Sequence, residues 1–318
     1  MGERRAGQNG TRRAFVRGLA AGGMLAPSLA RAQVRLETPP EVKLQTPEAI
    51  FESIVKASVD DAYRMTVPVH VNGEGPFPFV VDTGSNRSVI SDLLALKLNL
   101  PMMNAMQVHA ATGVVSTGAV RVSNMNVGPR WLRDFDAPVF QAGSLGAVGI
   151  LGIDAVADQM IMMDFRHNRM TIESGHGFEP DPGAVVVRGH TRYGQLVLLN
   201  CMVEDIEILV IIDTGGEVTI GNPALRQAVT RRRAGIGTPG GVSSVTGESV
   251  PADLAFLPQV RFGRVLVDSM QIAYADMFAF RQFGLDRRPA MLLGMDTLRR
   301  FDRVSVDFLG REVKFIVT

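Results

Sequence analysis

Two aspartates stand in nearly identical surroundings, at Asp82-Thr83-Gly84 and Asp213-Thr214-Gly215, and each follows an apolar run. A pair of carboxyl groups can activate a water toward a carbonyl carbon without a metal or a histidine. One carboxylate accepts the proton of the water, while the second, protonated carboxyl polarises the carbonyl oxygen. Two carboxyls about 3 Å apart share one proton, because both cannot ionise cheaply. The two tripeptides therefore predict a catalytic pair, Asp82 and Asp213.

The residues after each aspartate predict how the two loops are held. Thr83 and Thr214 offer short, stiff hydroxyl groups that can lock one loop to the other. Gly84 and Gly215 let the backbone turn tightly and let the loops approach without a Cβ between them. We therefore expect the two loops to be in direct contact.

The fourth position differs between the loops, because Ser85 follows the first tripeptide and Gly216 follows the second. A serine hydroxyl would donate a hydrogen bond to Asp82, whereas Gly216 offers Asp213 none. Glu217 adds a like charge next to the second loop. Both differences predict a raised pKa for Asp213. We therefore expect activity at mildly acidic to near-neutral pH rather than at strongly acidic pH.

Each aspartate is predicted to follow a β-hairpin and to precede a short helix. Alternating apolar residues and turn signals predict strands at 66–71, 77–81, 195–202 and 206–212. Ser91 is expected to cap a helix over 92–96, and Asn222-Pro223 to open one over 224–229. The two halves of the chain thus show the same order of elements.

Further landmarks repeat in the same order, which indicates an internal duplication. The matched segments are Ala111-Thr112-Gly113 with Val245-Thr246-Gly247, Ile150-Leu151-Gly152 with Leu292-Leu293-Gly294, and Met163-Asp164-Phe165 with Val306-Asp307-Phe308. The second copy is about ten residues longer, and we place the extra residues near 233–241. A duplicated strand-rich domain can be purely structural, but equivalent carboxylates in both copies favour a shared site.

The amino terminus resembles a twin-arginine export signal. Arg12-Arg13 precedes a mildly apolar stretch over 18–29, which ends in the small-residue site Ala30-Arg31-Ala32. We expect a signal peptide over 1–32 and a periplasmic product without stable membrane insertion. A basic tail or a short membrane anchor is the alternative. Residues 33–62 form either a pro-segment that covers the cleft or a helix packed outside the fold.

Composition is that of a globular protein and argues against several other functions. Hydrophobic residues make up 46% of the chain, and the net charge is +1, so nothing indicates a nucleic-acid partner. The single cysteine, Cys201, lies in an apolar segment and is expected to be buried. The five histidines lack ligand spacing, so we predict no metal and no cofactor.

From about Met65 to Thr318, the chain resembles an aspartic protease, with retropepsin-like lobes fused in one chain as in pepsin-like enzymes. The resemblance implies an all-β fold of two pseudo-twofold-related β-barrel lobes with short helices and an active site between the lobes. The predicted ranges are 63–176 for the first lobe, 177–190 for a linker and 191–318 for the second lobe. Because both lobes are in one chain, we expect a monomer.

The resemblance also assigns roles to individual residues. It makes Asp82 and Asp213 the catalytic pair, and it has Thr83 and Thr214 interlock the two loops. It places two flexible flaps at Thr112, Gly113, Thr246 and Gly247, and it gives loop support to Leu151, Gly152, Leu293 and Gly294. The first flap lacks the tyrosine of pepsin-like enzymes, so we do not transfer pepsin-type substrate rules.

Two functions fit these observations. The first is an aspartic endopeptidase that cuts an extended polypeptide by a water activated between Asp82 and Asp213. The second is a periplasmic peptide-binding module with a protease fold and weak or no catalysis, for which Gly216 is the sequence argument. Two carboxylates whose proximity costs stability favour the enzyme, because a binding module has no need of them.

Overall fold

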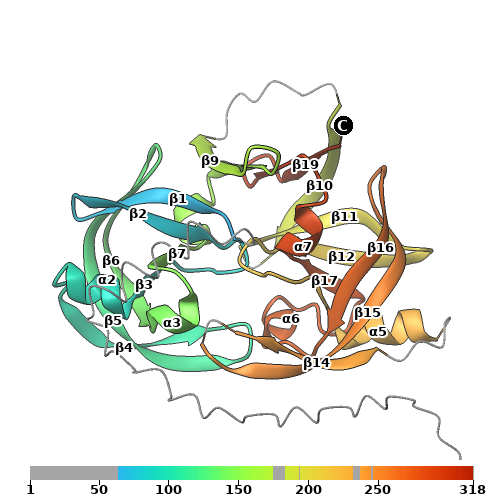
Figure 1. The fold of residues 1–318 in the computed structure, drawn as a ribbon, viewed down its shortest axis with the longest axis horizontal. Helices are drawn as coiled ribbons and strands as arrows, with labels where there is room; N and C mark the ends of the chain where they lie inside the picture. The colour runs from blue at the N-terminus through green and yellow to red at the C-terminus, as the bar shows by residue number, and fades with distance from the viewer. Residues whose placement is uncertain (1–63, 175–182, 193, 232–236, 245, 318) are drawn as a thin grey trace, which may run out of the picture. The chain divides into compact units, whose positions relative to one another are not determined.

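The computed structural model describes residues 64–174, 183–192, 194–231, 237–244 and 246–317. The predicted signal peptide (1–32) and the segment 33–62 lie outside these residues. The described chain is built mainly of β-strands with short helices, as predicted (Figure 1). None of its helices is long and apolar enough to cross a membrane.

The first half contributes a small barrel and the strands that leave it. Its elements are β1 (Thr66–Val71), β2 (Glu74–Val81), β3 (Val89–Ser91), α2 (Asp92–Lys97), β4 (Met102–His109), β5 (Val114–Val127), β6 (Arg130–Phe140), α3 (Ala142–Leu145), β7 (Gly149–Leu151), α4 (Ile153–Val156), β8 (Gln159–Asp164) and β9 (Arg169–Ser174). The sheet order is β1-β2-β7-β3-β6-β5-β4, and β1 also pairs with β5. That last pairing closes six strands into a barrel.

The apolar pattern of the sequence explains how β1 and β2 build this barrel. In β1 every second side chain (Val67, Val69 and Val71) is buried, as expected for a strand with one face in the core. At the end of β2, Val80 and Val81 are both buried, because they pair in parallel with the internal strand β7. The continuous apolar run before Asp82 is therefore the mark of an internal strand.

The second half repeats this order. Its elements are β10 (Val185–Arg192), β11 (Gln195–Val203), β12 (Ile206–Ile212), β13 (Ile220–Gly221), α5 (Pro223–Thr230), β14 (Thr238–Ser243), β15 (Ser249–Phe262), β16 (Val265–Tyr274), α6 (Phe278–Gln282), β17 (Ala290–Leu293), α7 (Met295–Leu298), β18 (Arg303–Asp307) and β19 (Glu312–Ile316). Here β15 also pairs with β11, as β5 does with β1. The predicted duplication of two acid-protease lobes is confirmed.

The helix caps predicted from the sequence are present in both copies. Ser91 accepts a hydrogen bond from the backbone N–H of Leu94 at the start of α2. Asn222 accepts one from Leu225, and Pro223 is the first residue of α5. Both helices therefore begin where a side chain satisfies a free backbone N–H.

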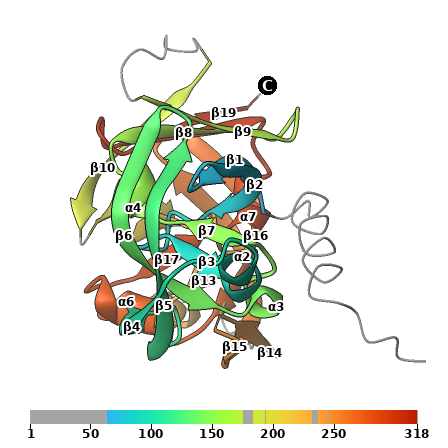
Figure 2. The same cartoon turned by 90° about the vertical axis from the view of Figure 1, so that its left-hand side faces the viewer.

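A sheet made from both halves joins the two lobes. Its strand order is β10-β19-β18-β8-β9, so β8 and β9 of the first half pair through β18 with the carboxyl-terminal strands. In Figures 1 and 2, β9 and β19 lie close together at the top. Residues 185–190 of the expected linker belong to strand β10, which pairs with β19.

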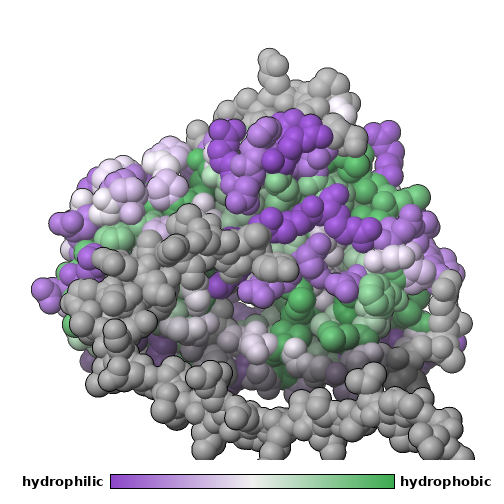
Figure 3. Space-filling view, viewed as in Figure 1, coloured by the Kyte–Doolittle hydropathy of each residue, from purple (hydrophilic) through white to green (hydrophobic). Residues whose placement is uncertain are grey.

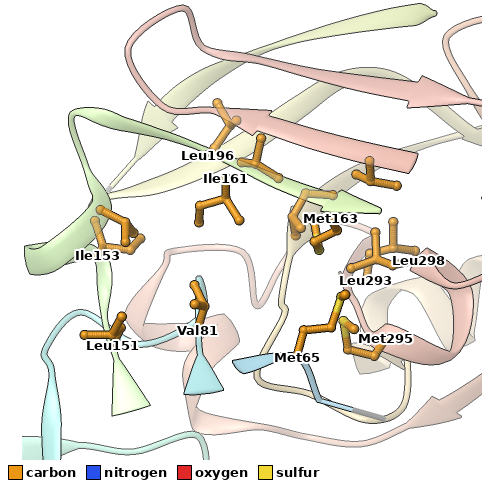
Figure 4. Packing of buried hydrophobic residues seen from close by; sticks show 14 of the residues in the cluster. Met65, Val81, Leu151, Ile153, Ile161, Met163, Leu196, Leu293, Met295 and Leu298 are labelled. Carbon is orange, nitrogen blue, oxygen red and sulfur yellow. The ribbon is translucent and has the colours of Figure 1, made fainter. Parts of the chain in front are cut away.

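The hydrophobic core is continuous from one lobe to the other through this sheet. Figure 4 shows Val81 and Leu151 of the first lobe near Ile161, with Leu293 and Leu298 of the second lobe on the other side of Met163. All six of these side chains are fully buried. Packing of this kind gives the loops after β2 and β12 a rigid common base.

The position predicted for the extra residues of the second lobe was wrong. The flap glycines stand 31 and 34 residues after their aspartates, so few extra residues precede the second flap. Most of them lie between β16 and β17, over 275–289, where the first lobe has only 141–148. Phe280 and Phe283 of this segment are buried in an apolar cluster, which explains why it is folded rather than a loose loop.

Candidate active site

The two aspartates lie at equivalent places, each directly after a parallel strand pair. The backbone N–H of Asp82 donates to Leu151 O at 2.9 Å, and that of Asp213 donates to Leu293 O at 3.0 Å. A Cβ on Gly152 would lie 2.6 Å from Arg87 O, and one on Gly294 would lie 2.5 Å from Val218 O. The supporting residues predicted from the sequence thus touch the aspartate loops, and glycine is needed where the chains cross.

A second set of supports was missed in the sequence. The Asp154 carboxylate accepts hydrogen bonds from the backbone N–H and the hydroxyl of Ser88. The Asp296 carboxylate accepts the same two bonds from Thr219. The signal was available, because both acids follow the repeated Leu-Gly landmark and both hydroxyl residues stand six positions after Asp82 or Asp213. Ser88 and Thr219 are buried, and these two pairs fix the course of each loop after its aspartate.

Thr83 and Thr214 connect the two loops to each other. The Thr83 hydroxyl donates to Ile212 O at 2.7 Å and accepts from the N–H of Thr214 at 3.1 Å. In the opposite direction, the Thr214 hydroxyl donates to Val81 O at 2.6 Å and accepts from the N–H of Thr83 at 3.1 Å. Both threonines are buried. Four hydrogen bonds therefore join the loops with twofold symmetry.

The two carboxylates receive the same backbone donors. Gly84 and Ser85 donate their N–H groups to Asp82 Oδ1 at 2.8 and 3.1 Å. Gly215 and Gly216 donate theirs to Asp213 Oδ1 at 3.2 and 3.1 Å. Both side chains face the same cleft, and each aspartate keeps part of its surface accessible. Each loop therefore presents its carboxyl group in one fixed orientation.

The role predicted for the Ser85 hydroxyl was wrong. Its Oγ donates to Arg87 O at 2.8 Å and not to Asp82. A serine hydroxyl readily bonds a backbone group two residues away, and here this local contact takes precedence. Because only the backbone N–H of Ser85 reaches Asp82, the glycine at 216 offers Asp213 an equivalent donor. The two loops are more alike than their sequences indicate.

The glycines that follow the threonines are required by space. A Cβ on Gly215 would lie 2.5 Å from both carboxylate oxygens of Asp82. A Cβ on Gly84 would lie 2.8 Å from Asp213 Oδ1. Each loop thus passes so close to the carboxyl group of the other lobe that no side chain fits between them.

Burial and proximity raise the pKa of both aspartates. Burial, followed by the charge of Asp82, raises the pKa of Asp213 to about 7, against the N–H donors of Gly216 and Gly215. Burial also raises the pKa of Asp82, but its N–H donors and the positive charge of Arg64 oppose that shift. The carboxyls hydrogen-bond to each other, which favours the ionised form of Asp82 and the protonated form of Asp213, so the pair shares one proton. The direction predicted for Asp213 was right, although its cause was not the absence of a serine.

The predicted flap residues lie at the tips of two hairpins that meet. Thr112 and Gly113 lie between β4 and β5, and Thr246 and Gly247 lie between β14 and β15. The Thr112 hydroxyl donates to Glu248 Oε2 at 2.7 Å and lies 3.5 Å from that of Thr246. The first tip also accepts a hydrogen bond at Ala111 O from Ala279 N of α6. The two hairpins therefore close one side of the cleft.

The cleft has a volume of about 490 Å³ and contains both aspartates. A hollow of similar volume, about 480 Å³, lies on the first lobe between Arg87 and Trp131. Its two carboxylates are engaged, since Asp154 bonds Ser88 and Asp136 pairs with Arg121. We therefore assign the chemistry to the cleft that holds the carboxyl pair.

The remaining predictions on reactive groups concern cysteine and metal ions. Cys201 is fully buried in strand β11, as expected, and burial raises the pKa of its thiol to about 12. Within the described ranges, no group of three histidine, cysteine or acidic residues is placed to hold a metal ion. The raised pKa and the burial make the Cys201 thiol a poor nucleophile.

Comparison with protein families gives the same assignment twice. A family model described as aspartyl protease matches residues 67–155 and again residues 199–297, which together make up more than half of the chain. Each matched range contains one Asp-Thr-Gly loop and its supporting Leu-Gly segment. No curated protein matches the chain at a significant level. By its sequence and by its duplicated fold, the chain belongs to the aspartyl protease family.

Proposed function

We propose that the protein is an aspartic endopeptidase that hydrolyses peptide bonds of an extended polypeptide bound in the cleft. The observation that carries the proposal is the carboxyl pair. Asp82 and Asp213 come from equivalent loops, receive equivalent backbone donors and hydrogen-bond to each other in a cleft. A shared proton on a rigidly held pair is what general acid and base catalysis on an amide requires.

The two aspartates have different parts in the proposed reaction. The positive charge of Arg64 favours the ionised form of Asp82, so we place the shared proton on Asp213. Asp82 accepts a proton from a water whose oxygen adds to the substrate carbonyl carbon, while Asp213 donates a hydrogen bond to the carbonyl oxygen. The proton on Asp82 then passes to the amide nitrogen as the C–N bond breaks. The products are a carboxylic acid and an amine.

The alternative, a peptide-binding module without catalysis, has lost its specific support. It depended on Gly216, which was expected to leave Asp213 short of one donor. Because the Ser85 hydroxyl bonds Arg87 O, the two aspartates have the same number of donors. No feature of the described site now favours binding without turnover.

The enzyme proposal is tested by cleavage of a denatured protein mixture with the wild type and with Asp82→Asn. The wild type should cut between pH 3 and 8, a range that spans roughly the carboxyl to histidine pKa values. Asp82→Asn should cut at least about a thousandfold more slowly, because it removes the general base. Asp286→Asn, which changes an exposed carboxylate, should cut normally. Equal cutting by wild type and Asp82→Asn, or no cutting at any pH, would refute the proposal.

The pH dependence gives a separate prediction. Asp213 has to be protonated, and its pKa is raised to about 7. Activity, measured as kcat/KM on one peptide, should therefore persist to near-neutral pH and fall about tenfold per pH unit well above that value. A profile that peaks below about pH 3 would contradict this, because it would require an Asp213 that ionises as readily as an ordinary carboxyl.

A further inference from the structure

Arg64 and Gln195 occupy equivalent positions in the duplicated chain but have different contacts. Each stands eighteen residues before the aspartate of its lobe. Gln195 is fully buried, and its Nε2 donates across the lobes to Asn86 Oδ1 at 3.1 Å and Gly84 O at 3.4 Å. Arg64 instead donates through Nη2 to Gly146 O of its own lobe at 3.2 Å and lines the cleft. Gln195 therefore joins the two lobes, whereas the equivalent Arg64 lines the cleft.

The guanidinium of Arg64 has donors to spare. Its Nε is buried and has no hydrogen-bond partner, and the described residues give the group a single acceptor, Gly146 O. A guanidinium carries five N–H donors in a planar fork that fits a carboxylate with two parallel hydrogen bonds. Arg64 is also the one arginine or lysine among the described residues that line the cleft. The group is therefore a ready binding point for an anion.

The surroundings of Arg64 leave room for a side chain. Besides Arg64, the first-lobe wall of the cleft includes Val89, His109, Phe140, Gly143, Ser144, Gly146 and Ile150. At Gly143, no atom lies within 4 Å of the place that a Cβ would occupy. A Cβ on Gly146 would collide with the guanidinium of Arg64, so glycine at this position leaves room for that group.

The opposite wall has a large apolar part. That part is formed by Val218, Ile220, Met277, Ala279, Phe283 and Leu292, with Glu217 and Gln282 also on the second-lobe side. Met277, Ala279 and Phe283 belong to the longer segment around α6, for which the first lobe has only the shorter α3 segment. Figure 3 shows apolar surface in the region where Figure 1 draws α6. The lobes thus present two chemically different walls on either side of the same carboxyl pair.

We propose that Arg64 makes the first-lobe side of the cleft a recognition site for an acidic side chain, while the second-lobe side takes a bulky apolar one. The preferred substrate is then a polypeptide with glutamate or aspartate next to a large apolar residue at the scissile bond. An acidic side chain near the aspartate pair or Glu217 would meet like charge, whereas Arg64 offers it a positive charge and N–H donors. The inference rests on the proposed endopeptidase function.

Four eight-residue peptides test this specificity, with alanines around a central Glu-Phe, Phe-Glu, Gln-Phe or Phe-Gln. Wild type should cleave one glutamate peptide at least about tenfold faster than its glutamine counterpart, measured as kcat/KM at one pH. Arg64→Gln carries the residue that the second lobe has at this position, and it should reduce that ratio to about one. Its rate on both peptides should also fall, because the charge of Arg64 favours the ionised form of Asp82. Arg64→Lys should keep part of the preference. If the ratio of kcat/KM between the glutamate and glutamine peptides were the same in wild type and Arg64→Gln, the inference would be overturned, but the proposed endopeptidase function would stand.

Binding to an inert variant separates failure of the inference from failure of the proposed function. Fluorescently labelled forms of the four peptides are titrated with Asp213→Asn and with Asp213→Asn/Arg64→Gln. The first variant should bind one glutamate peptide about tenfold more tightly than its glutamine counterpart, and the second should bind both equally. If the two variants bind in this way but the wild type cleaves none of the peptides, the recognition site is supported and the endopeptidase function is rejected. Equal Kd values for glutamate and glutamine peptides with the first variant would reject the recognition site.

Discussion

Asp213→Asn should abolish hydrolysis and at the same time raise the unfolding temperature of the protein at pH 8. Burial and the charge of Asp82 raise the pKa of Asp213 from 3.8 to about 7, so the folded protein holds a proton that the unfolded chain releases. Between about pH 4 and pH 7 the folded state therefore binds more protons, and its free energy of unfolding falls as pH rises. Above about pH 7 the full cost of ionising the buried Asp213 carboxyl lowers the free energy of unfolding.

The size of this effect follows from the shift. Three pKa units correspond to about 4 kcal/mol as an upper limit, and the partial exposure of Asp213 to the cleft reduces it to roughly 1–3 kcal/mol. Asparagine can still accept the N–H bonds of Gly215 and Gly216 through its oxygen, so the loop keeps its shape. At pH 8 we expect a gain of several degrees in Tm, at about 2–4 °C per kcal/mol.

Thermal unfolding at several pH values provides the measurement. The difference in Tm between Asp213→Asn and wild type should be largest at pH 8 and should shrink as the pH falls toward 4. Asp286→Asn removes an exposed carboxylate and should differ from wild type by the same small amount at every pH. A difference for Asp213→Asn that does not change with pH would show that the buried carboxyl carries no such penalty.

The fold could be predicted because its determinants repeat in the sequence. The apolar run before each Asp-Thr-Gly marks an internal strand, β2 or β12, and the Leu-Gly segments mark β7 and β17, which pair with them in parallel. Asn222-Pro223 and Ser91 mark helix starts by local capping chemistry. Each of these signals depends on a few neighbouring residues, and duplication made each of them visible twice.

Features that depend on distant contacts could not be predicted in this way. Whether the Ser85 hydroxyl bonds Asp82 or Arg87 O depends on the path of the loop, and both partners are within its reach in sequence. The longer segment over 275–289 has no landmark, since its place is decided by burial of Phe280 and Phe283. Likewise, the different contacts of Arg64 and Gln195 appear only when the lobes are seen together. The sequence thus located the carboxyl pair, but not the contacts of the side chains around it.

The second large effect is expected from the hydrogen bonds that Thr83 and Thr214 make between the two loops. Thr83→Val keeps the shape of the side chain and removes the hydroxyl that bonds Ile212 O and the N–H of Thr214. Two buried backbone groups then lose a partner, at a cost of about 1–3 kcal/mol each. We expect Thr83→Val to lower the free energy of unfolding by roughly 2–5 kcal/mol, and Thr214→Val to do the same through Val81 O and the N–H of Thr83.

Urea unfolding of a double-mutant cycle distinguishes the interlock from ordinary packing. Thr83→Ser keeps the hydroxyl and loses one methyl group, so it should cost only about 1 kcal/mol. Because the hydroxyls lie 3.4 Å apart and serve the same contact, Thr83→Val/Thr214→Val should destabilise by less than the sum of the single changes. If Thr83→Ser lowered the free energy of unfolding as much as Thr83→Val does, packing of the methyl group, and not the hydroxyl, would hold the loops together. The distinction matters for catalysis, because a join made of hydrogen bonds fixes the direction of both loops and with it the approach of Asp82 to Asp213.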